Sequence, residues 1–169
     1  KLLIIAATIL AFLLGLLFTY DTKPINTYQA STSVYSVAYG KTKESVNSSI
    51  ALISYADIVT SSRVCERAAL LINETAEIDA STIQNMIGVY AVSDSVIEIS
   101  AISSNPKMSI LVANAVAEAF VREITSITAN DAIQILDAAE YCNLNGNGVK
   151  DLFIKRALFA MVGFVISCA

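Results

Sequence analysis

Histidine and tryptophan are absent from this sequence of 169 residues, and proline occurs only twice. Histidine is the commonest general base and the commonest metal ligand in proteins, so its absence excludes a Ser-His-Asp catalytic site. The sequence also lacks a phosphate-binding glycine-rich loop, a GxSxG motif and an HExxH motif. We therefore predict that the chain is not an enzyme and that it has no catalytic, cofactor-binding or metal-binding residues.

Cysteine and positive charge are also scarce. The three cysteines, Cys65, Cys142 and Cys168, form no CxxC motif, so a zinc site is not indicated. Cys65 and Cys142 could form a disulfide in an oxidising compartment, and the sequence leaves that pairing open. The net charge is −4 with no basic tract, which argues against nucleic acid as a partner. Acidic residues such as Asp94 and Glu98 fit solvated turn and strand positions better than a catalytic carboxylate pair.

Hydrophobic residues make up 55% of the chain and are concentrated at its two ends, in residues 2–18 and 157–169. The first run is uncharged, and the next two residues bring it to the length that spans a bilayer. We predict transmembrane helices at residues 1–20 and 152–169, with the second cut short at Ala169. A cleaved signal peptide is the alternative for the first run, and a buried soluble helix is the alternative for the second.

The residues between these ends, 21–151, are polar enough to form one folded domain with its own core. The positive-inside rule gives conflicting signals for its location, because Lys1 indicates a cytoplasmic N-terminus while Lys150, Lys155 and Arg156 indicate the opposite. We favour an extracytoplasmic domain, in a protein that crosses the cell membrane twice.

Periodicity predicts the elements of this domain. We expect a strand at 28–39, a helix at 43–56, a second helix beginning after an Asp57 cap, and a short helix at 80–86 with Ser81 as its cap. Residues 87–93 and 95–102 are typical of a β-hairpin. In its second strand Ile97, Ile99 and Ala101 share one face, while Glu98 and Ser100 lie on the other.

Asn105 and Pro106 are typical of the cap and first position of a helix, which we expect to continue to residue 129. A last strand is expected at 131–140, followed by a polar connector rich in asparagine and glycine. This order predicts an α+β fold, in which a small mixed sheet has helices packed on one face and is flanked by the two transmembrane helices.

Several short motifs resemble those of one known family. They are the "YQAS" start of the first strand, the "SVIEISAI" strand, Asn105-Pro106, the "VANAVAEAF" helix, the "ILDAA" strand and the "IKRALFAMVG" entry to the second span. In their order and spacing they resemble the chain-length determinant family, the Wzz-type polysaccharide co-polymerases, in its small Gram-positive capsular form. The motif residues, to which the resemblance gives a structural role, are Tyr28, Ala30, Asn105, Pro106, Asn114, Leu136, Asp137 and Ala139.

The resemblance implies a bacterial membrane protein without cofactors whose external domain assembles into a homo-oligomeric ring. It would regulate the length and export of a capsular polysaccharide or exopolysaccharide together with a polymerase. It would also engage a cytoplasmic tyrosine kinase through a segment outside this chain. The sequence departs from the family in one place, since "NLNGNG" stands where the family has a proline-rich segment before the second span.

Four charged residues are candidate contacts between subunits of such a ring: Arg63, Arg67, Glu118 and Arg122. Two other functions remain open. One is the extracytoplasmic sensor domain of a two-span receptor. The other is the N-terminal part of a fused membrane tyrosine kinase.

Overall fold

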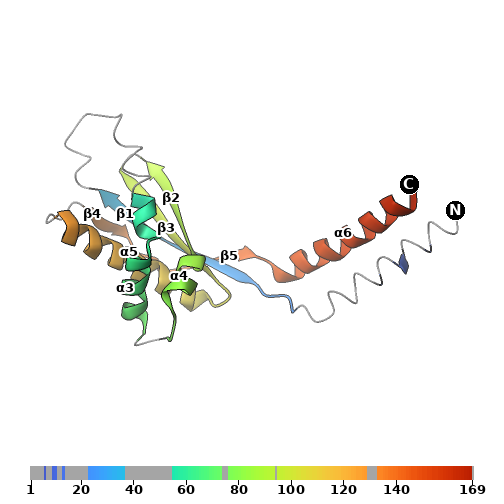
Figure 1. Ribbon diagram of the computed structural model, residues 1–169, viewed down its shortest axis with the longest axis horizontal. Helices are drawn as coiled ribbons and strands as arrows, with labels where there is room; N and C mark the ends of the chain where they lie inside the picture. The colour runs from blue at the N-terminus through green and yellow to red at the C-terminus, as the bar shows by residue number, and fades with distance from the viewer. Residues whose placement is uncertain are drawn as a thin grey trace. The chain divides into compact units, whose positions relative to one another are not determined.

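The computed structural model describes residues 23–36, 55–73, 76–93, 95–128 and 133–168, together with Ala6, Ile9, Leu10 and Leu13. The chain divides into two compact units, Tyr28–Asn143 and the two chain ends Lys1–Thr27 and Leu144–Ala169 (Figure 1). Most of the helix expected at 43–56 and most of the first apolar run lie outside the described residues.

A five-stranded sheet forms the centre of the fold. Its strands are β1 (Thr27–Ser36), β2 (Ile87–Ser93), β3 (Val96–Ser103), β4 (Ile133–Asp137) and β5 (Asn143–Gly146). The order is β2-β3-β1-β4, and β5 also pairs with β1. The sheet is antiparallel and not mixed as expected, because β3 lies between β1 and β2 and runs opposite to both. The α+β class is confirmed.

Alternation along β1 and β3 produces the buried face of this sheet. Their register places Ala30 opposite Ala101, Thr32 opposite Ile99 and Val34 opposite Ile97. All six side chains are buried. Successive side chains of a strand point to opposite faces, so these residues share the face that packs against the helices.

The described helices of this unit are α3 (Ser62–Ile72), α4 (Ala80–Met86) and α5 (Pro106–Thr128). The long helix α5 contacts β3 and β4, α3 packs against α5, and α4 contacts α3 and β3 (Figure 1). Buried side chains of α3 include Val64, Cys65 and Ala68, and Phe120 is the largest fully buried side chain of α5. The apolar residues that recur at three- and four-residue steps in the sequence therefore form the faces of these helices that point into the core.

The start of α5 confirms the prediction for Asn105 and Pro106. The side-chain oxygen of Asn105 accepts a hydrogen bond from the backbone N–H of Lys107 at 3.0 Å, and Pro106 is the first helical residue. The hydroxyl of Ser109 donates to the carbonyl of Tyr28 at 2.9 Å, which fixes this end of the helix on β1.

Two predicted helix caps were wrong. The helix expected to begin after Asp57 is interrupted at Thr60 and Ser61, and the cap of α3 is Ser61. The hydroxyls of these two residues donate to the carbonyls of Ala56 and Ile58, so they compete with the helical hydrogen bonds.

The cap position of α4 is Asp79 and not Ser81. The hydroxyls of Ser81 and Thr82 both donate to the Asp79 carboxylate, which holds the pKa of that carboxyl below its ordinary value. A capping serine would accept a hydrogen bond from the helix backbone, whereas the hydroxyl of Ser81 donates one to the residue at the cap position, Asp79.

The expected polar connector contains regular structure. After β4, which is shorter than predicted, residues 143–146 form β5, and α6 (Gly148–Cys168) begins four residues earlier than expected. The side-chain oxygen of Asn147 accepts hydrogen bonds from the backbone N–H groups of Val149 and Lys150, so Asn147 caps α6. Among the described residues, no helix combines the length and apolar composition required to cross a membrane.

Cys65 and Cys142 are free thiols. Cys65 is fully buried in α3, and burial raises the pKa of its thiol, whereas Cys142 is half-buried. A raised pKa keeps the unreactive thiol form populated to higher pH, and modification also requires the helix to open.

We therefore predict that Cys65 reacts with a disulfide reagent at least about tenfold more slowly than Cys142 in a Cys168→Ser background. The measurement is the labelling rate of each cysteine by peptide mass spectrometry, with labelling in urea as the control that equalises the two. Equal rates for the folded protein would contradict the buried position of Cys65.

Candidate functional site

The side-chain amide of Asn114 joins three segments that are far apart in the sequence. Its Oδ1 accepts from the backbone N–H of Ala139 at 2.8 Å, and its Nδ2 donates to the carbonyl of Ala139 at 2.9 Å. The hydroxyl of Thr32 in β1 donates to the same Oδ1 at 2.8 Å. The hydroxyl oxygen of Thr32 also accepts from the N–H of Ala139 at 3.3 Å.

Asn114 thus bonds both backbone groups of Ala139, as the backbone of a neighbouring strand would. Ala139 lies between β4 and β5, which both pair with β1, but it belongs to neither strand. A buried backbone group without a partner costs about 1–3 kcal/mol, so the amide holds this segment against α5. The contact explains why polar Asn114 lies within an apolar helix.

A second close contact joins the two ends of the domain. The side-chain oxygen of Asn26 accepts from the backbone N–H of Gly148 at 3.1 Å. A Cβ atom on Gly148 would lie 2.4 Å from the nitrogen and 2.6 Å from the oxygen of Ile25. Only glycine allows the two backbones to approach so closely, so residues 25–26 and the start of α6 are held side by side.

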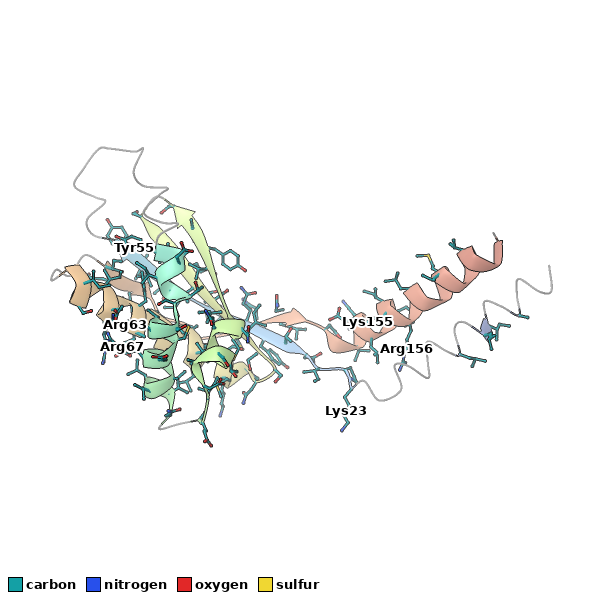
Figure 2. All side chains as sticks on the ribbon, in the orientation of Figure 1. Lys23, Tyr55, Arg63, Arg67, Lys155 and Arg156 are labelled. Carbon is teal, nitrogen blue, oxygen red and sulfur yellow. The ribbon has the colours of Figure 1, made fainter. Side chains whose placement is uncertain are left out.

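The candidate subunit contacts Arg63 and Arg67 form ion pairs within the chain. Nε of Arg63 lies 3.1 Å from Oε1 of Glu123, and NH1 of Arg67 lies 2.9 Å from Oε2. The second contact is an ion pair without hydrogen-bond geometry. The side chain of Glu123 is only 3% exposed, whereas those of Arg63 and Arg67 are 75% and 36% exposed. Figure 2 shows both arginines on α3.

This cluster holds α3 against α5 and carries one more positive than negative charge. Sequence reasoning did not identify Glu123. A signal was present, because Glu123 stands three residues after Phe120 and one before Ile124, within the apolar stripe of α5. A carboxylate in such a stripe requires a cationic partner, since burial of an unpaired charge is costly.

The other two candidate contacts, Glu118 and Arg122, pair with each other on the surface of α5. Both side chains are about half exposed, so the pair contributes little to stability, about 0.3 kcal/mol. These two side chains are available to a neighbouring molecule without any change in the core.

The remaining motif residues have different environments. Ala30 is buried on the core face of β1, and the carbonyl of Tyr28 accepts from Ser109. Leu136 is exposed, and Asp137 is exposed opposite Ser33. The structure therefore brings together the strand of Ala30, the helix of Asn114 and the segment of Ala139, and leaves Leu136 and Asp137 at the surface.

No protein-family model matches the chain, and no curated protein matches it.

We predict that Asn114→Ala lowers the free energy of unfolding by about 2–3 kcal/mol, because it removes the partner of the Ala139 carbonyl and leaves the Ala139 N–H with only its longer bond to Thr32. Urea unfolding followed by circular dichroism measures this loss. The matched control is Asn145→Ala, since Asn145 is exposed in β5 and we expect a change below about 0.5 kcal/mol. Equal effects of the two substitutions would contradict the role given to Asn114.

The ion pairs of Glu123 predict that losing both arginines costs more stability than losing the glutamate. Replacing both Arg63 and Arg67 by methionine leaves the buried Glu123 carboxylate without a cationic partner. This change is expected to lower the free energy of unfolding by about 3 kcal/mol. Glu123→Gln alone leaves only exposed arginines and is expected to cost about 1 kcal/mol or less.

The triple variant, which combines all three changes, should therefore be more stable than the double arginine variant. The same urea measurement tests this, with Arg122→Met as the surface control. A triple variant that is less stable than the double variant would show that the arginines do not neutralise Glu123.

Proposed function

We propose that this chain is a membrane-anchored polysaccharide co-polymerase, which regulates the chain length and export of a capsular polysaccharide or exopolysaccharide. It acts with a polymerase, and with a cytoplasmic tyrosine kinase through a segment outside this chain. The observation that carries the proposal is the contact of Thr32, Asn114 and Ala139. Two motifs that suggested the family, "VANAVAEAF" and "ILDAA", meet through this contact, and they are joined there by Thr32, the residue that follows "YQAS".

The paired ends of the domain support a two-span anchor. Asn26 and Gly148 hold the entering and leaving segments together, and an apolar sequence continues from each of them. In this proposal α6 enters the bilayer beyond Arg156. Its exposed apolar side chains would then face lipid: Leu158, Met161, Val162 and Val165. Lys155 and Arg156, labelled in Figure 2, would extend to the headgroups.

Assembly into a ring is the remaining part of the proposal. Two spans fix the orientation of each copy in one membrane, which favours cyclic association. Because Arg63 and Arg67 stabilise the fold through Glu123, the pair Glu118 and Arg122 is the better candidate for a contact between copies.

The function is tested by the length distribution of the extracellular polysaccharide, measured on gels from cells that lack the gene and from cells with it restored. We expect loss to broaden or shift the distribution and the wild-type gene to restore it. Gly148→Val should fail to restore it, because any Cβ collides with the backbone of Ile25.

Val149→Ala is the matched control, since the neighbouring Val149 side chain is exposed, and it should restore the distribution. Immunoblots of the membrane fraction establish that each variant is present. Unchanged lengths and amounts in cells that lack the gene would refute the co-polymerase function.

A further inference from the structure

The sheet has a second face, opposite to the one that packs against α5. Thr32 points toward α5, because its hydroxyl is bonded to Asn114, so the residues that alternate with it point the other way. On β1 and β3 this second face carries Gln29, Ser31, Ser33, Tyr35, Glu98 and Ser100, with Val96 and Ile102 at the two ends of β3. The middle of this face is polar, in contrast to the apolar face that forms the core.

The strand register arranges these side chains in rows across the sheet. One row crosses three consecutive strands in the order Tyr90, Glu98 and Ser33. The next row runs Gly88, Ser100 and Ser31. Neighbouring strands are about 4.8 Å apart, so the first row places an aromatic ring, a carboxylate and a hydroxyl group close together.

The ring of Tyr90 lies close to Gly88, in space that a larger residue at position 88 would share. A Cβ atom on Gly88 would lie 3.1 Å from the hydroxyl and 3.3 Å from a ring carbon of Tyr90. Ser100, opposite Gly88 in the register, is completely buried, and its hydroxyl donates to the carbonyl of Gly88 at 3.3 Å. Tyr90 itself remains 55% exposed. The outer surface of the ring is therefore a flat aromatic platform beside a polar row.

We infer that this face binds a neutral, hydroxyl-rich sugar polymer, an inference that rests on the proposed function. A flat aromatic ring packs against the apolar C–H face of a sugar ring. Carboxylate and hydroxyl oxygens at neighbouring positions accept and donate hydrogen bonds to sugar hydroxyls. The platform of Tyr90 and the row through Glu98 and Ser33 provide both kinds of group side by side.

The charge of this face favours neutral sugar polymers over acidic ones. None of the strands β1, β2, β3 and β4 contains lysine or arginine, and the polar row carries the carboxylate of Glu98. A polymer rich in uronate or phosphate groups would bring like charges together without a compensating cation. Neutral sugars meet no such repulsion, so the site discriminates against acidic polysaccharides.

The test uses the full chain in detergent micelles. The probes are oligosaccharides from partial hydrolysis of the extracellular polysaccharide, separated by anion exchange into neutral and acidic fractions, with dextran oligosaccharides as a second neutral probe. Calorimetry is expected to detect saturable binding of at least one neutral probe and none of the acidic fraction. Saturable binding of the acidic fraction alone, or of no probe at all, would overturn the inference.

Tyr90→Ala is expected to weaken binding about tenfold, while Tyr90→Phe retains most of it because the ring remains. Gly88→Val should weaken binding similarly, since the added side chain displaces the ring while the phenol is kept. The matched control Tyr141→Ala removes an exposed tyrosine outside the strands and should leave binding unchanged. Thermal unfolding by circular dichroism establishes that each variant is folded.

Affinities of Tyr90→Ala and Gly88→Val within about twofold of wild type would assign the bound sugar to another surface and refute the inference. Altered polysaccharide lengths in cells that lack the gene, together with normal binding by these variants, would support the co-polymerase proposal and refute the binding face. Unaltered lengths, together with binding that depends on Tyr90, would support the binding face and refute the co-polymerase proposal.

Discussion

The pair of hydrogen bonds between the side chain of Asn114 and the backbone of Ala139 is the contact on which the rest of this domain depends. Ala139 lies in the segment between β4 and β5, outside either strand. A single amide, placed on the long helix, supplies a donor and an acceptor to its backbone. Because the same oxygen accepts from Thr32, the helix, the first strand and the segment that leads to α6 are fixed to one another at one point.

The one buried carboxylate also has its partners on another element of the fold. Glu123 is the only charged side chain among the buried residues that the structure describes, and it is paired with the exposed Arg63 and the partly buried Arg67. Desolvation therefore falls mainly on the carboxylate, and Arg63 keeps most of its hydration. Such a cluster fixes the position of α3 on α5 more than it adds to stability, because a carboxylate at this depth tolerates few other arrangements.

Periodicity in the sequence was sufficient to find the elements whose side chains alternate or recur regularly. The hairpin of β2 and β3 and the start of α5 at Pro106 follow from local patterns, and the structure has them close to the predicted positions. Local patterns failed where a hydroxyl or an amide bonds in an unexpected direction. Thr60 and Ser61 break a helix by bonding to preceding carbonyls, and Asn147 begins α6 inside an apparent connector. The partners of Glu123 and Asn114 could not be derived, since each lies on a different element.

Histidine, which the sequence lacks, is the side chain whose ordinary pKa lies between about pH 5 and 8. The contacts that fix the helices of this domain are therefore built without an imidazole. They use the amide of Asn114, which carries no charge, and the carboxylate of Glu123, which is paired with the guanidinium groups of Arg63 and Arg67. Each of these polar groups lies within an apolar helix face and has its partner on another element, so each specifies how two elements pack and not only that they pack.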